Sequence, residues 1–251
     1  MLKDPPAVND SAPGKGALEM PADVQAMFAR IAARYDLVNA ILSGGLDYYW
    51  RRKAARLVAG WQPGNLLDLA TGSGVLAGTL ARACPETEIV GADFSLPMLQ
   101  RARASGRVAR LVAADAMQLP FASGVFDAVT VAFGLRNMAS YGDALREMRR
   151  VLRPGGHVLI LDFSVPGGWW RNLYRVYLHR CLPTVAGIFC GERAAYRYLG
   201  ESIERFPRGE HMRALLSESG FTEPSAQELC GGIVSLYTAV APAVTKTTPS
   251  N

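Results

Sequence analysis

The sequence has few residues of the kinds that build metal centres and disulfide frameworks. It contains four cysteines and three histidines in 251 residues. No two cysteines form a Cys-x-x-Cys pair, and no group of cysteines and histidines has the spacing of a zinc site. The sequence therefore predicts free thiols in a reducing compartment and no bound metal.

Long apolar runs are missing as well. No uninterrupted apolar stretch approaches the roughly 18 residues that a membrane span needs. The first residues, MLKDPPAVNDSAPGKG, have no apolar core of the kind found in a signal peptide. These absences predict a cytoplasmic protein, whose contact with a membrane would be peripheral and on its inner face.

What the sequence does contain is an ordinary globular composition with a mild excess of positive charge. Hydrophobic residues make up 49% and charged residues 20%, which suits one sizeable core and excludes a disordered chain. The net charge of +5 comes mostly from arginine. That charge is compatible with weak attraction to anionic lipid or nucleic acid, and equally with a solvated basic surface.

The two ends of the chain differ from its middle. Residues 1–20 are rich in Pro, Gly, Ser and Ala and predict a flexible tail, and residues 242–251 form a polar tail. Residues 21–241 are interpreted as a single domain. Helical periodicity from Ala22 to Ala59, interrupted at residues 43–45, predicts two or more helices in front of the main fold.

Short apolar runs alternate with helical segments through the middle of the chain. Such runs indicate a parallel sheet with helices on both faces. The expected strands lie at residues 65–70, 88–93, 109–115, 126–133 and 157–164, with the turn RPGG before the fifth. An aromatic, mainly helical insertion over 165–207 interrupts the pattern, which resumes with a helix over 209–219 and strands near 226–229 and 233–239.

A glycine-rich turn follows the first expected strand in LLDLATGSGVLAG. Gly72, Gly74 and Ala77 fit the pattern G-x-G-x-x-[G/A], and Asp93 follows about 20 residues later at the end of the second strand. Both dinucleotides and S-adenosyl-L-methionine (SAM) bind at such turns. The pattern alone does not separate the two cofactors.

Asp68, just before the glycines, favours SAM. A dinucleotide places its pyrophosphate on this turn, and two like charges about 4 Å apart cost on the order of 4 kcal/mol at an effective dielectric of 20. SAM instead carries an ammonium and a sulfonium, which an acid attracts. With either cofactor, Asp93 is expected to accept hydrogen bonds from two ribose hydroxyls. Asp115, after the third strand, is placed either to meet the adenine amine or to cap a following helix.

Several segments resemble the C-methyltransferases of menaquinone and ubiquinone biosynthesis. The resemblance runs from about Met27 to Ala239, and its most specific parts are the first block, FGLRN and YRYLxESI. In order, the segments are MFARIAARYDLVNAILSGGLDYYWRR, LLDLATGSG, GADFSLPML, DAMQLPFASGVFDAVTVAFGLRNM, EMRRVLRPGGHVLILDFS, YRYLGESIERFP and GGIVSLYTA.

The resemblance implies a class I methyltransferase, with a Rossmann-like sheet of seven mostly parallel strands, that uses SAM to methylate a ring carbon of a polyprenylated quinol. It places cofactor contacts on Ser73, Asp93, Asp115 and Ala116. Two departures concern the cofactor end of the site. Val75 stands where relatives have an aspartate, and Ala132 where many have a small hydroxylated residue.

Arg136 and Asn137 end the fourth strand, on the side where ligands bind in such sheets. A guanidinium beside a quinol oxygen would favour the phenolate, which activates the adjacent ring carbon. Asn137 would orient the ring or a water, and Tyr35 is a second candidate for contact with the quinol oxygens, with Asp36 orienting it or Arg136. The alternatives are that Arg136 pairs with an acid, that Asn137 caps a helix and that Tyr35 lines the core.

Aromatic and arginine side chains alternate in the insertion. Trp169, Trp170, Tyr174 and Tyr177, interleaved with arginines, suit a membrane–water interface, a lid over an apolar tail or packing against the N-terminal helices. No target-base motif such as Asn-Pro-Pro-Tyr follows the fourth strand, so nucleic acid is not expected as a partner. The sequence leaves a homo-oligomer open.

Two other functions compete with quinol methylation. One is SAM-dependent methylation of another aromatic or secondary metabolite, which the departures at Val75 and Ala132 keep open. The other is a non-catalytic subunit that binds a quinone. The intact Gly72-Ser73-Gly74 turn with Asp93 argues against the second.

Overall fold

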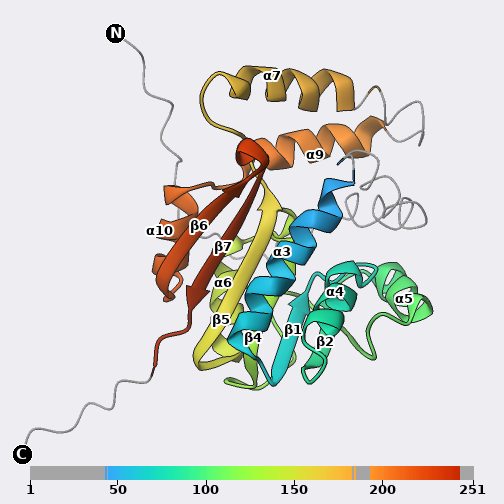
Figure 1. Ribbon diagram of the computed structural model, residues 1–251, viewed down its shortest axis with the longest axis vertical. Helices are drawn as coiled ribbons and strands as arrows, with labels where there is room; N and C mark the ends of the chain where they lie inside the picture. Colours follow the sequence, from blue (N-terminus) through green and yellow to red (C-terminus); the bar gives the residue numbers. More distant parts are fainter. Residues whose placement is uncertain (1–42, 44, 183, 185–192, 244–251) are drawn as a thin grey trace, which may run out of the picture.

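The computed structural model describes residues 43, 45–182, 184 and 193–243. Within them, seven strands form one sheet in the order β3-β2-β1-β4-β5-β7-β6 (Figure 1). All neighbouring pairs from β3 to β5 are parallel, and β7 is antiparallel to both β5 and β6. The strands are β1 (Asn65–Leu69), β2 (Glu88–Asp93), β3 (Arg110–Ala113), β4 (Phe126–Ala132), β5 (Leu152–Phe163), β6 (Thr222–Leu229) and β7 (Val234–Val240). The prediction of seven mostly parallel strands is confirmed.

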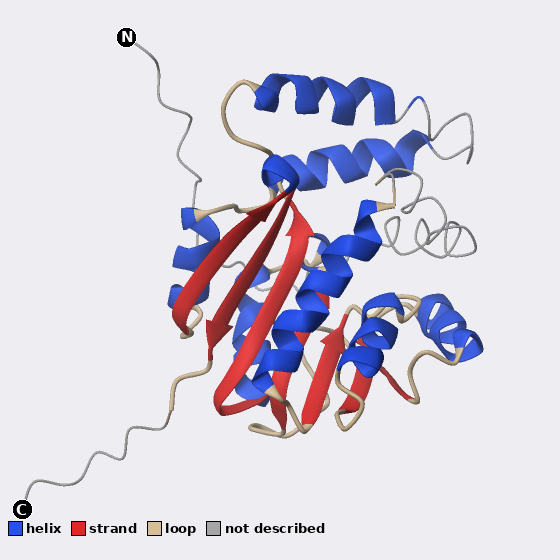
Figure 2. Cartoon of the chain, viewed as in Figure 1, coloured by secondary structure: helices blue, strands red, loops and turns tan. Residues whose placement is uncertain are grey.

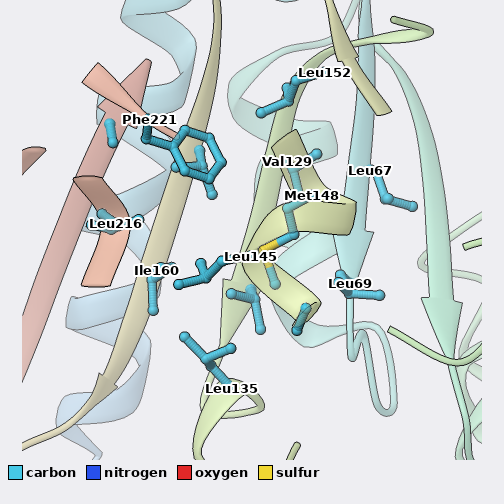
Figure 3. Close-up of a cluster of buried hydrophobic side chains, with 14 of the residues drawn as sticks. Leu67, Leu69, Val129, Leu135, Leu145, Met148, Leu152, Ile160, Leu216 and Phe221 are labelled. Carbon is cyan, nitrogen blue, oxygen red and sulfur yellow. The ribbon is translucent and has the colours of Figure 1, made fainter. Parts of the chain in front are cut away.

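Helices cover both faces of this sheet (Figure 2). On one face, α6 and α10 pack on the sheet; Figure 3 shows Leu145 and Met148 of α6 around Leu67, Val129 and Ile160. On the other face, α3 and α4 bury Trp50 and Leu80 among a second set of apolar side chains. Strands buried on both sides are mostly apolar, which is why β1 and β4 appear in the sequence as short apolar runs with few polar residues, Asp68 in β1 and Asp127 and Thr130 in β4 among them.

The helices follow the alternation expected from the sequence. Each fully buried leucine or isoleucine contributes about 1.5–3 kcal/mol, so the two packed faces account for most of what holds the layers together. The helices are α3 (Leu46–Trp61), α4 (Val75–Ala83), α5 (Leu96–Ser105), α6 (Tyr141–Val151), α7 (Trp170–Val176), α9 (Arg193–Arg205) and α10 (Glu210–Glu218).

The insertion after β5 is helical, as expected. Helix α7 continues into the π-helical segment η3 (Tyr177–Cys181), and η3 lies against α9. Figure 1 shows α7 and α9 beyond the carboxyl end of β5 and not on a face of the sheet. This arrangement places the insertion above the edge where ligands bind in α/β sheets.

Strand β5 begins five residues earlier than expected. Leu152 already pairs with Phe126 of β4, and the backbones of Gly155 and Gly156 exchange hydrogen bonds of 2.8 Å with Ala241. The segment RPGG, expected as a turn, therefore lies inside the strand. The helices expected before Ser43 and the predicted tail over residues 1–20 lie outside the described residues.

Candidate active site

The residues predicted to hold a cofactor lie along one edge of the sheet. The strand order reverses between β1 and β4, and ligands of open α/β sheets bind at the carboxyl ends of the strands beside such a reversal. Asp68 lies near the end of β1, Asp93 ends β2, Asp115 follows β3 and Arg136 follows β4. Four strands thus bring side chains from distant parts of the chain to a single edge.

The turn after β1 leaves open space beside its backbone. Gly72 has a φ of 58°, and a Cβ atom added there would meet no protein atom within 4 Å. Gly74 begins α4 with a φ of 80°, a conformation that glycine adopts without strain. The turn therefore combines a backbone conformation that favours glycine with room for a ligand at its surface.

Asp93 ties this turn to the end of β2. Its Oδ2 accepts a hydrogen bond of 2.8 Å from the backbone N–H of Gly72, and its Oδ1 accepts one of 2.8 Å from Ser95. Burial raises the pKa of the Asp93 carboxyl, and these backbone donors oppose the rise. Because each carboxylate oxygen can accept more than one hydrogen bond, both remain able to accept ribose hydroxyls.

Asp68 is almost completely buried beneath the turn. The hydroxyls of Thr71 and Thr130 donate to its two oxygens over 2.7 and 2.8 Å. Burial raises the pKa of Asp68 to about 6, with the two hydroxyls acting in the opposite direction. A cation near the turn would favour the ionised form, in agreement with the attraction for SAM inferred from the sequence.

The other three residues expected to contact the cofactor are half-buried or buried and already contact other parts of the protein. Asp115 Oδ1 accepts a hydrogen bond of 2.9 Å from the N–H of Met117, closing a turn, and no helix follows directly. Ala116 is half-buried and packs against the core. Ser73 is buried in the glycine turn, where its carbonyl accepts from Ser105 and Arg107.

The backbone after β4 is sharply bent. Phe133 has a φ of 59°, which is uncommon for a bulky residue, and a Cβ atom on Gly134 would lie 2.5 Å from the Cβ of Ala70. Only glycine fits this close approach to the end of β1. The bend leads into the short 3-10 helix η2 (Leu135–Asn137), which carries Arg136 and Asn137.

Arg136 is buried, with 6% of its surface exposed, and forms an ion pair with Asp162 of β5. Its Nη1 donates to Asp162 Oδ1 over 2.7 Å and to the carbonyl of Phe133 over 2.6 Å. The Arg136 backbone N–H also donates to Asp162 Oδ2. Burial raises the pKa of Asp162, and the guanidinium opposes the rise. One carboxylate therefore holds both the backbone and the side chain of Arg136.

Asn137 links the site to the insertion. Its Oδ1 accepts a hydrogen bond of 3.4 Å from the hydroxyl of Tyr198 on α9, and its amide points to the Phe133 carbonyl. Asn137 ends η2, and the next helix, α6, is capped by Ser140. Asn137 therefore does not cap the helix that follows it. Tyr35 and Asp36 lie outside the described residues.

An apolar cavity of about 740 Å³ lies beside this site. Its wall includes Phe163, whose ring centroid is 5.3 Å from the Cζ of Arg136. The Phe163 ring therefore touches both the cavity and the guanidinium. The cavity is formed by α3, the end of β5, α7 with η3, α9 and the segment after β6, including Trp50, Trp170, Leu173, Tyr177, Leu199 and Cys230.

The aromatic residues of the insertion do not behave as one group. Tyr174 is buried and lines the cavity, whereas Trp169 is 74% and Trp170 52% exposed, with their rings stacked at 4.3 Å. Tyr174 therefore packs inward while the two tryptophans are exposed, and the N-terminal helices of the packing alternative lie outside the described residues.

The model of the ubiE/COQ5 methyltransferase family matches residues 17–241. The chain belongs to the ubiE/COQ5 methyltransferase family.

Curated relatives agree with this assignment. The chain is 49% identical over 201 residues to a demethylmenaquinone methyltransferase of Thermus thermophilus, and the aligned residues cover 78% of this chain and 91% of the relative. It is 44% identical over 222 residues to the ubiquinone/menaquinone biosynthesis C-methyltransferase UbiE of Syntrophotalea carbinolica, covering 86% and 92%. Among solved structures, a SAM-dependent methyltransferase from Thermotoga maritima has a TM-score of 0.61 at 18% identity, covering 86% of this chain and 99% of that one, and shows the shared fold.

This family member is a methyltransferase, and SAM is its methyl donor. The residues of the glycine turn fit that cofactor: the open space at Gly72, the Asp93 carboxylate beside it and the buried acid Asp68 below it. None of these groups supplies a cation for a pyrophosphate. The preference for SAM over a dinucleotide, inferred from Asp68, is confirmed.

Two residues that contact the predicted site residues were not predicted from the sequence: Asp162, which pairs with Arg136, and Tyr198, which donates to Asn137. Asp162 stands inside the apolar run HVLILDFS, where an acid at a buried position was a usable signal. Tyr198 lies in YRYLGESIERFP, the segment that the family resemblance singled out. The neighbours of Tyr198 on α9, Leu199 and Ile203, line the cavity.

Proposed function

We propose that this methyltransferase transfers the SAM methyl group to a ring carbon of a polyprenylated quinol, either a demethylmenaquinol or a ubiquinol precursor. The observation that carries the proposal is the apolar cavity lined by Phe163, whose ring lies against the Arg136 guanidinium. An apolar cavity suits a prenyl tail, and a cation behind its wall suits a ring oxygen. The names of the two curated relatives include this class of substrate.

Arg136 is assigned to the ring oxygen. A quinol hydroxyl resembles tyrosine, with a pKa of about 10, so a quinol is poorly nucleophilic at neutral pH. The guanidinium would favour the phenolate, which moves electron density to the adjacent ring carbon. Arginine stays protonated and cannot accept the proton itself, so a water is the expected acceptor. Asn137, held by Tyr198, would orient the ring or that water.

When bound, SAM supplies an electrophilic methyl group on a positively charged sulfur. Asp93 would accept hydrogen bonds from its ribose, and the backbone of the Gly72 turn would lie against it. The buried Asp68 carboxylate beneath the turn would balance its positive charge. Asp162 would hold the guanidinium through Nη1 and the Arg136 backbone through its N–H while the ring binds. Peripheral contact with lipid follows from the same proposal, because a prenylated quinol partitions into the bilayer.

A single assay tests the proposal. Purified protein is mixed with SAM and a reduced short-chain demethylmenaquinol, and mass spectrometry detects a carbon-linked methyl group. A benzoquinol with the same short chain is run in parallel to establish the ring preference. Absence of product from either quinol, with SAM binding intact, would direct the search to a different aromatic acceptor.

Replacing Asp93 by alanine is expected to weaken SAM binding by about 10- to 100-fold, because hydrogen bonds to a charged group contribute roughly 1.5–3 kcal/mol. Isothermal titration calorimetry measures the dissociation constant. Glu88→Ala is the matched control, since this exposed acid lies at the opposite end of the same strand and pairs only at the surface. An unchanged dissociation constant for Asp93→Ala would remove Asp93 from the cofactor site.

A further inference from the structure

Helix α7 and segment η3 expose most of their apolar side chains. Tyr174 and Leu178 are the buried residues of these two elements. Trp169, Trp170, Leu173, Val176 and Tyr177 are exposed. A contiguous apolar surface of this kind on a globular protein usually marks an interaction site. In Figure 1, α7 is the outermost helix on its side of the molecule.

The exposed surface continues into the cavity. Trp170, Leu173, Val176 and Tyr177 are exposed to solvent and also line the cavity wall. Leu46, at the start of α3, likewise is exposed and lines the wall. The cavity therefore opens outward between apolar side chains, so an apolar ligand would enter across an apolar surface.

The charged side chains of the segment that carries this surface have one sign. From Phe163 to Gly191 the chain has three arginines, Arg171, Arg175 and Arg180, and no aspartate or glutamate. Arg175 pairs with Glu204 of α9 over 2.6 Å, while Arg171 and Arg180 are exposed. Such a surface is complementary to an anionic partner.

We propose that the lipid face, defined as Trp169, Trp170, Leu173, Val176 and Tyr177 with Arg171 and Arg180, rests on an anionic phospholipid bilayer. Tryptophan and tyrosine favour the headgroup region, and arginine reaches phosphates while its apolar stem stays with the acyl chains. No helix of the described residues is long and apolar enough to cross a membrane. With the lipid face on the bilayer, α7 would lie in the plane of the interface. The inference rests on the proposed function in one respect: the cavity mouth then faces the layer that holds a prenylated quinol.

A second copy of the chain fits this surface less well. In a twofold interface the same patch meets itself, which would bring the arginines of both copies together with no acid of this segment to neutralise them. The anionic bilayer supplies the missing negative charge.

Vesicle flotation with the full chain tests the lipid face. The wild type is expected to float with vesicles of phosphatidylcholine and phosphatidylglycerol, and more weakly with phosphatidylcholine alone. Trp169→Asp is expected to lower the bound fraction by about tenfold or more, because it places an acid at the anionic surface. Val125→Asp is the matched control, since Val125 is an exposed apolar residue just before the amino end of β4, whereas α7 lies beyond the carboxyl end of the neighbouring parallel strand β5. Val125→Asp should float like the wild type.

Two results would overturn the lipid face: a wild type that does not float, or Trp169→Asp that floats as well as Val125→Asp. A wild-type dimer in solution that Trp169→Asp dissociates would instead assign the surface to a second copy. Methylation of a short-chain quinol without vesicles separates this inference from the proposed function. Trp169→Asp should retain that activity, whereas failure of the wild type in that assay would contradict the proposed substrate and leave the flotation result standing.

Discussion

Replacing Arg136 by methionine is expected to lower turnover of a short-chain quinol by about 100- to 1000-fold, the loss typical of removing one group that stabilises a developing oxyanion. Methionine keeps much of the volume of the side chain but has no charge. The dissociation constant for SAM is expected to stay within about threefold, because the glycine turn and Asp93 belong to other strands. Single-turnover kinetics and calorimetry on the same preparation measure the two quantities.

Arg136→Lys is the informative companion variant. Lysine keeps the charge, but its single nitrogen cannot reproduce the guanidinium geometry toward Asp162 and a ring oxygen together. An intermediate loss of turnover is expected. Equal losses in turnover and in SAM affinity for both variants would contradict a role at the quinol oxygen and leave Arg136 as a structural residue.

The position of Arg136 could be predicted from the sequence, but its partner could not. An apolar run that ends in a charged residue indicates the carboxyl end of a buried strand, and the order of strands and helices indicates which edge of the sheet binds ligands. Asp162 lies 26 residues away in the chain. It reaches Arg136 because β4 and β5 pair with Ala132 beside Leu161, and periodicity does not report such a register.

The cavity and the lipid face also required the structure. The insertion has apolar residues and arginines around its whole helical circumference, so its sequence pattern does not say which side packs inward. Tyr174 and Leu178, four residues apart, form the buried side. Packing of η3 against α9 favours that side, and the pattern within α7 and η3 does not report this contact.

Replacing Asp162 by alanine is expected to lower the free energy of unfolding by about 3–5 kcal/mol, because it leaves a buried guanidinium without its carboxylate. The change also removes the acceptor for the backbone N–H groups of Arg136 and Phe163. Urea unfolding followed by fluorescence measures the loss. Glu88→Ala breaks the exposed pair with Arg110 and should cost less than about 1 kcal/mol.

Combining Arg136→Met with Asp162→Val separates structure from catalysis. An apolar pair in place of a buried ion pair is often as stable as the original, so the double variant is expected to recover about 2 kcal/mol of the loss caused by Asp162→Ala. The recovery is incomplete because the two backbone N–H groups still lack their acceptor. Turnover should stay as low as in Arg136→Met. A double variant that regained both stability and turnover would show that the pair only holds the end of β4 against β5, and that another group activates the quinol.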